Sequence, residues 1–298
     1  MRRLVLASML LLALPLSLAA QTMQHYIPYV LHMPIKNADG TVATCLDGFG
    51  DLVSSNFQPL YDTLVGIANP TGQAGDVALR FFRQDGTPAL WGGGADRYTY
   101  RLQAGRSVAM TLIHGNVFPQ PPQDFVGYGI VETPLGFTVY AMLGGSGCYP
   151  QHWNHFSANV PVRTSLAALS TWVLPYAIPQ FEDVQHLGPN SYRSGLVITN
   201  FDVTPVTFRI TFTVGDFYPH AGSQYTFTTQ QVGAGKSVSF DLYRSLLDLA
   251  GYPAPGDSRN NSEGWVRIEA SAPVRAFPYL LLSNRDYSEF SSGEIPAF

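Results

Sequence analysis

The residues best suited to chemistry gather in one stretch, GGSGCYPQHWNHF, from Gly144 to Phe156. His152 and His155 stand three apart in it, and imidazole nitrogens are common zinc ligands. Tyr149 and Trp153 accompany them, and exposed aromatic rings offer large contact areas to a ligand or a partner. The stretch therefore has three interpretations: a metal site, a glycan-contact surface, or a connector whose aromatic residues pack internally.

A second group of ligand-type residues lies in the stretch GDSRNNSEG, from Gly256 to Gly264. Asp257 and Glu263 supply carboxylate oxygens, which calcium accepts, but their spacing differs from that of an EF-hand. A plain polar loop is the alternative. The metal candidates are thus His152, His155, Asp257 and Glu263, and no cofactor is expected.

Two cysteines, Cys45 and Cys148, lie in Gly-rich segments on either side of a strand-rich region. In a secreted chain two cysteines commonly pair. We expect a Cys45–Cys148 disulfide. The alternative is that the two cysteines do not pair with each other, and that one of them bonds to another chain.

No familiar catalytic constellation is present, because the sequence contains neither G-x-S-x-G nor H-E-x-x-H. The stretch GAGKS, from Gly233 to Ser237, ends like a phosphate loop, but Gln230 occupies the position of the motif's first glycine. The alternation of Val238 and Phe240 then predicts a strand rather than a helix. We expect no enzymatic activity. Trp91, before three glycines, is expected at a loop tip as a contact residue.

The N-terminus has the order of a secretory signal peptide over residues 1–20: two arginines, an apolar run and two alanines. The mature chain is expected to be secreted or periplasmic, without a membrane span. The formal net charge is −4, and no basic stripe is present to neutralise phosphates, which argues against nucleic acid. Low charge (13%) with 28 Gly and 22 Pro is typical of an all-β chain.

The elements that carry these residues occur twice, about 131 residues apart. TLVGIANPTGQAGDVALRFF, from Thr63, and SGLVITNFDVTPVTFRITF, from Ser194, both alternate apolar and polar residues around an Asn-containing turn. This predicts two tandem Ig-like antiparallel β-sandwich domains from an internal duplication; one closed double-size barrel is the alternative. The expected boundaries are 21–157 for the first domain, 158–171 for the linker, 172–284 for the second domain and 285–298 for a tail.

The segments YIPYV, TLVGIANPT, FFRQDGTPA, YRLQAGRSV and GYGIVETP resemble a poorly characterised module that is repeated in secreted bacterial proteins. The second copy lacks the proline after Asn200 and the Asp-Gly turn, but it carries Gly264-Trp265. The resemblance implies an Ig-like fold and no catalytic residue.

The expected function is therefore a non-catalytic binding or structural role. The alternatives are a subunit of an extracellular assembly, a carbohydrate-binding module, and a hydrolase without a recognisable motif. The partner is expected to be an extracellular glycan or protein, or another copy of the chain. Loops that differ between the copies are the expected contact sites: 91–97, 148–156, 218–223 and 252–263. We expect Trp91 and Trp153 to be accessible, and Trp172 and Trp265 to lie in the core.

Overall fold

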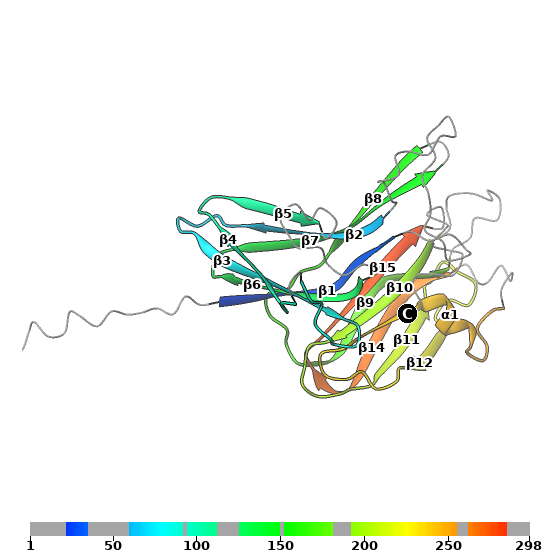
Figure 1. Ribbon diagram of the computed structural model, residues 1–298. Helices are drawn as coiled ribbons and strands as arrows, with labels where there is room; N and C mark the ends of the chain where they lie inside the picture. The colour runs from blue at the N-terminus through cyan, green and yellow to red at the C-terminus, as the bar shows by residue number, and fades with distance from the viewer. Residues whose placement is uncertain are drawn as a thin grey trace, which may run out of the picture.

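The computed structural model describes residues 22–34, 60–91, 94–111, 125–149, 152–180, 192–254 and 262–284 (Figure 1). These residues form fifteen strands and one short helix, and the paired strands run antiparallel. The prediction of an all-β chain is confirmed. None of the described residues forms a helix long and apolar enough to cross a membrane.

The first unit is one antiparallel sheet in the order β4-β3-β6-β1-β2-β7-β8, with β5 also paired to β2. Its strands are β1 (Thr22–Pro34), β2 (Leu60–Ala68), β3 (Gly75–Arg83), β4 (Tyr98–Leu102), β5 (Ser107–Thr111), β6 (Phe125–Pro134), β7 (Thr138–Tyr149) and β8 (His152–Val160). β1 pairs with β6 along most of its length and with β2 from His32 onward. This change of partner lets the sheet fold over a core that includes Ile27, Val65, Val77, Leu79, Phe81 and Leu143.

The second unit contains two sheets, in the orders β12-β11-β14-β9 and β13-β10-β15. Its elements are β9 (Leu169–Gln180), β10 (Tyr192–Asn200), β11 (Phe208–Val214), β12 (Gln224–Thr228), β13 (Ser237–Asp241), α1 (Leu242–Leu247), β14 (Ser262–Val274) and β15 (Ala276–Asn284). The core between the sheets includes Trp172, Leu196, Ile198, Phe208, Phe212 and Val266. The expectation that Trp172 is buried is therefore confirmed.

The two units repeat one pairing scheme. The order β4-β3-β6-β1 corresponds to β12-β11-β14-β9, and β5-β2-β7 corresponds to β13-β10-β15. The register repeats as well, because Glu132 on β6 faces Ala78 on β3, and Glu269 on β14 faces Arg209 on β11. These are the positions that the sequence repeat aligns.

Asn69 and Asn200 show why an asparagine stands at the turn after β2 in the first unit and at the end of β10 in the second. Both are fully buried. The Asn69 side-chain amide donates to the backbone oxygens of Gln73, Leu102 and Gln103 at 2.8–3.3 Å. The Asn200 amide donates in the same way at 2.9–3.2 Å, to the backbone oxygens of Thr204, Val232 and Gly233. Each amide therefore ties two neighbouring turns together.

A second polar contact also recurs. In the first unit the Leu31 N–H donates to the Thr63 hydroxyl oxygen at 2.8 Å, and in the second the Ile178 N–H donates to the Ser194 hydroxyl oxygen at 2.9 Å. All four residues are buried. In each unit the hydroxyl accepts a hydrogen bond from a buried backbone N–H that is not bonded to the backbone of a neighbouring strand.

The units are not separate, because the sheet of β13, β10 and β15 is covered on both faces. Along β10, Leu196 and Ile198 belong to the second core, whereas Val197 belongs to the first. Thr199 donates its hydroxyl to the Pro28 oxygen of β1 at 2.9 Å. On β15, Tyr279 also packs into the first core. The second unit thus completes the core of the first.

Two turns, one after β3 and one before β13, hold this interface together. The Ser237 N–H donates to the Gln84 oxygen at 2.9 Å, and the Tyr128 hydroxyl donates to the Gly235 oxygen at 2.6 Å. Gly86 has φ +83°, and a Cβ there would lie 2.7 Å from the Gly235 oxygen, so only glycine fits. The stretch GAGKS is thus a turn leading into β13, as predicted, and not a phosphate loop.

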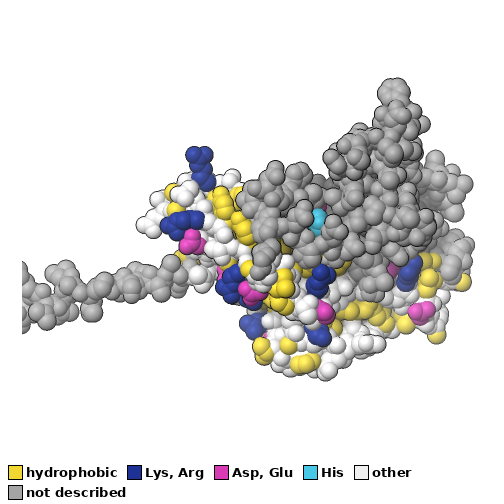
Figure 2. Space-filling view, viewed as in Figure 1, with side chains coloured by type: hydrophobic (Ala, Val, Ile, Leu, Met, Phe, Trp, Pro, Cys, Tyr) yellow, Lys and Arg dark blue, Asp and Glu magenta, His cyan; other side chains and the backbone are white. Residues whose placement is uncertain are grey.

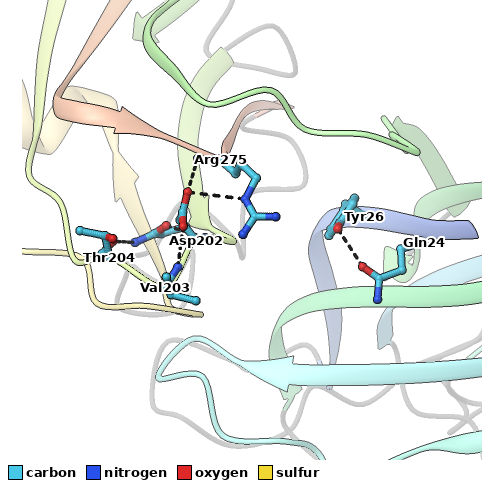
Figure 3. Close-up of polar contacts among 7 residues, drawn as sticks. Gln24, Tyr26, Asp202, Val203, Thr204 and Arg275 are labelled. Atoms are coloured by element: carbon cyan, nitrogen blue, oxygen red, sulfur yellow. Dashed lines mark hydrogen bonds and ion pairs between the residues drawn. The ribbon is translucent and has the colours of Figure 1, made fainter.

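The turn after β10 lies beside β1 (Figure 3). The Phe201 ring meets the Tyr26 ring edge-on, with centroids 4.9 Å apart. Hydrogen bonds from the backbone N–H groups of Arg275 and Val203 lower the pKa of Asp202 below its ordinary value. The turn is therefore held by its own carboxylate while its aromatic ring contacts the first unit.

Candidate binding surface

Trp91, predicted to be an accessible contact residue, is buried, with 5% of its surface exposed. Its ring packs on those of Phe81 and Tyr98, both at 5.5 Å. The loop folds back on itself, because the Trp91 N–H donates to the Ala95 oxygen at 2.8 Å. The expectation for Trp91 is therefore wrong: its large apolar ring closes one end of the first core.

Tyr149 on β7 pairs with His152 on β8, and Cys148 pairs with Trp153, so these two strands form an antiparallel pair. This pair extends beyond the rest of the first unit in Figure 1. Only the backbone is described for Cys148 and for the candidate residues Tyr149, His152, Trp153 and His155, and Cys45 lies outside the described residues. The disulfide and the contact roles of Tyr149 and Trp153 therefore remain predictions.

The side chains of His152 and His155, on β8, lie outside the described part of the structure, so their metal role remains a prediction. Asp257 lies outside the described residues, and Glu263 accepts a hydrogen bond from the Tyr218 hydroxyl. Among the described residues, no three His, Cys, Asp or Glu side chains form a group that could hold a metal ion.

A buried His–Asp pair is present that the sequence did not suggest. Nδ1 of His32 lies 3.2 Å from Oδ1 of Asp62, and both residues are buried. A carboxylate that orients a histidine is part of a hydrolytic triad, but no hydroxyl or thiol of the described residues is hydrogen-bonded to His32. The pair joins β1 to β2 where β1 changes partner, which is a structural role.

Several of the described aromatic residues that reach solvent lie at one end of the outer face of the four-stranded sheet, whereas Tyr140, 50% exposed, lies on β7 of the first unit. Phe217, in the β11–β12 loop, is 98% exposed, and Tyr176 on β9 is 53% exposed. Trp265, half-buried on β14, lies opposite Thr213 of β11, and the bulge of β9 at Tyr176 flanks it on the other side. We call Tyr176, Phe217, Tyr218 and Trp265 the aromatic surface.

The expectation that Trp265 is a core residue is wrong. Val266 and Ile268 point into the second core, so the odd-numbered residues of this part of β14, Trp265 among them, occupy the outer face. The sequence comparison had placed Trp265 in a strand correctly but on the wrong face. It is half-buried on this outer face, next to the bulge of β9 at Tyr176.

The loop that carries Phe217 is held in one conformation. The Gly215 N–H donates to the Glu263 oxygen at 2.8 Å, and the Gly222 N–H donates to the Val214 oxygen at 3.0 Å. The Tyr218 hydroxyl is hydrogen-bonded to the Glu263 carboxylate. Burial, this hydrogen bond and the charge of Glu263 raise the pKa of Tyr218, which therefore keeps its proton. The loop presents the Phe217 ring without a loss of loop entropy on binding.

The rest of this outer face is polar and internally paired. Glu269 lies 2.9 Å from Arg267 and 3.7 Å from Arg209. On the side of the molecule that Figure 2 shows, charged side chains are scattered among uncharged ones rather than gathered in a patch. The aromatic surface is thus bordered by solvated charge pairs.

Part of this surface is predictable from the sequence. The loop 218–223, which differs between the copies, begins one residue after Phe217. The exposure of Tyr176 could not be predicted from sequence, because it depends on which other parts of the chain pack beside its strand. The His32–Asp62 pair could not be predicted either, because its members are 30 residues apart on neighbouring strands.

No protein-family model and no curated protein sequence matches the chain. Among solved structures, the crystal structure of Thermotoga maritima protein 1070 is similar, with a TM-score of 0.28 and 12% identity. The match covers 48% of this chain and 96% of that one. A similarity at this level supports no conclusion about function.

Proposed function

We propose that the chain is a secreted or periplasmic, non-catalytic β-sandwich protein that binds a partner protein through the aromatic surface. Its two units are two Ig-like copies of one duplicated domain, related to the module of secreted bacterial proteins that the sequence resembles. The repeated pairing scheme and the matching contacts of Asn69 and Asn200 support the duplication.

The observation that carries the binding role is Phe217, 98% exposed on a loop that backbone and side-chain hydrogen bonds hold in place. A fully exposed apolar ring gains free energy when a partner covers it, and aromatic residues dominate the binding energy of protein interfaces. Tyr176 contributes to the raised pKa of Tyr218, in agreement with the two residues lying on the same end of this face.

A protein partner fits this surface better than a glycan does. Phe217 and Tyr218 differ strongly in exposure, and Trp265 is half-buried, so the rings offer no evenly exposed platform for a sugar chain. The Tyr218 hydroxyl and the Glu263 carboxylate already bind each other. The exposed part of the surface is thus mainly apolar.

Site-specific photo-cross-linking in the producing cell tests this proposal. A photoreactive phenylalanine at position 217 should give one discrete protein adduct. Val203, 79% exposed in another turn of the same unit, is the matched control position and should not give it. The absence of any adduct at 217, or the same adducts at 203, would contradict the proposal, and a specific signal on a glycan array would favour the carbohydrate-binding alternative.

A further inference from the structure

Strand β9 is the outermost strand of its sheet, and its N-terminal half presents an open edge. Val173 faces Arg267 of β14 on one side. On the other side, no backbone group within the described ranges is hydrogen-bonded to Val173. β9 contains no charged residue, and charged side chains are a common device that keeps exposed edges from pairing.

The equivalent edge in the first unit is occupied. Tyr26 on β1 corresponds to Val173, since Tyr26 faces Ile130 of β6 in the register in which Val173 faces Arg267 of β14. The Tyr26 N–H donates to the Arg163 oxygen at 2.8 Å, and the Arg163 N–H donates to the Tyr26 oxygen at 3.2 Å. Because the register is repeated, the backbone N–H and C=O of Val173 point toward the open edge.

The segment that reaches Tyr26 follows the last strand of the first unit. Val160 pairs with Ala141, and Arg163 comes three residues later. The sequence here is HFSANVPVR, from His155 to Arg163, and the sequence after the last strand of the second unit includes EFSSGEIPAF, from Glu289 to Phe298. The two share Phe-Ser, a β-branched residue before proline and an apolar residue after it, with one more residue between Phe-Ser and the proline in the second segment. Residues 285–298 lie outside the described part of the chain.

From this correspondence we infer that residues 294–298 bind the open edge of β9 at Val173, as residues 161–163 bind β1 at Tyr26. The reach is sufficient. Asn284 pairs with Tyr192, and the nearby Ser194 contacts Ile178, so Val173 lies about seven strand residues away, roughly 23 Å. Fourteen extended residues span up to about 46 Å.

The proline and the apolar side chains suit this site. Backbone pairing at this edge can only be short, because Pro175 has no N–H to donate to an incoming strand, just as Pro28 has none on β1. Ile295 and Phe298 would cover apolar surface next to Val173, which is 57% exposed. The bound segment would also prevent a second copy of the chain from pairing with this edge. This role differs from that of the aromatic surface, which binds a partner.

Amide hydrogen exchange followed by NMR on the full mature chain tests this inference, compared with a variant that lacks residues 294–298. The Val173 amide should exchange at least 100-fold more slowly in the full chain than in the truncated one. The Val197 amide, in the buried strand β10, reports on the fold and should stay protected in both. Ser291→Ala, outside the docking residues, should leave the Val173 protection unchanged.

Two results would overturn the inference. One is equal exchange of the Val173 amide in both chains while Val197 stays protected. The other is protection of Val173 that disappears on dilution, because it would place a second copy on the edge. Light scattering provides an independent readout: the truncated chain should associate and the full chain should stay monomeric.

Discussion

Replacing either Asn69 or Asn200 with alanine should cost the protein about 3 kcal/mol of unfolding free energy. Each asparagine is fully buried and supplies its amide to backbone oxygens of two turns. Alanine fits the space but leaves those oxygens without donors. The two substitutions should have similar effects, because the two sites share the amide contacts and one accepted backbone bond, and Asn69 adds only a bond from the Thr71 hydroxyl.

The magnitude follows from the hydrogen bonds that are lost. An amide has two N–H groups, so at most two of the three close acceptors of each asparagine are fully bonded at once. The side-chain oxygen accepts a bond from the Thr71 N–H at 3.0 Å in the first unit and from the Asp202 N–H at 2.9 Å in the second, and Asn69 also accepts one from the Thr71 hydroxyl at 2.6 Å. The three bonds that both sites share, at about 1 kcal/mol each, give the expected loss.

Urea unfolding of the mature chain, followed by tryptophan fluorescence, measures this loss as a change in midpoint at constant slope. Gln103→Ala is the matched control, since this exposed side chain lies in the turn that Asn69 holds and its backbone oxygen remains. It should change the unfolding free energy by less than about 0.5 kcal/mol. A loss below about 1 kcal/mol for either asparagine, or losses that differ more than twofold, would refute the reasoning.

Three further predictions concern other parts of the chain. Cys45 and Cys148 should be recovered as one linked peptide in non-reducing mass mapping; recovery of both alkylated without reductant would exclude the bridge. Burial lowers the pKa of His25, so the unfolded chain binds a proton that the folded one does not, and stability should fall as the pH drops below about 6.5. His25→Gln should remove that part of the pH dependence of the urea midpoint. Trp172→Ala should cost about 3–5 kcal/mol, because the ring fills the second core against Phe208, and a midpoint like that of the unsubstituted chain would place the ring outside the core.

The strands and their turns could be predicted from sequence because their signals are local. Alternation in the two repeats placed β2, β3, β10 and β11, and the asparagines marked the turns between them. The packing between the units was not predicted. The run from Leu196 to Thr199 is apolar or uncharged on both faces, which is typical of a strand covered on two sides, but nothing local tells which surface covers the second face.

The candidate site was harder to predict for a similar reason. Trp91 and Phe217 both lie in loops between corresponding strands, and nothing in composition separates the buried ring from the exposed one. Trp91 is buried because its loop turns back over Phe81. Phe217 is exposed because Tyr218, and not Phe217, is bonded to Glu263. These outcomes depend on contacts between distant residues, which a sequence pattern does not encode.

The most direct test of the proposed role is the affinity of the chain for the partner that position 217 captures. Phe217→Ser should weaken binding at least 30-fold, which corresponds to about 2 kcal/mol for an aromatic anchor. The urea midpoint should not change, since the ring touches solvent on nearly all sides. Val203→Ser, which removes a comparably exposed apolar side chain elsewhere on the unit, should leave the affinity within twofold. An unchanged affinity for Phe217→Ser, or an equal loss for both variants, would contradict the account.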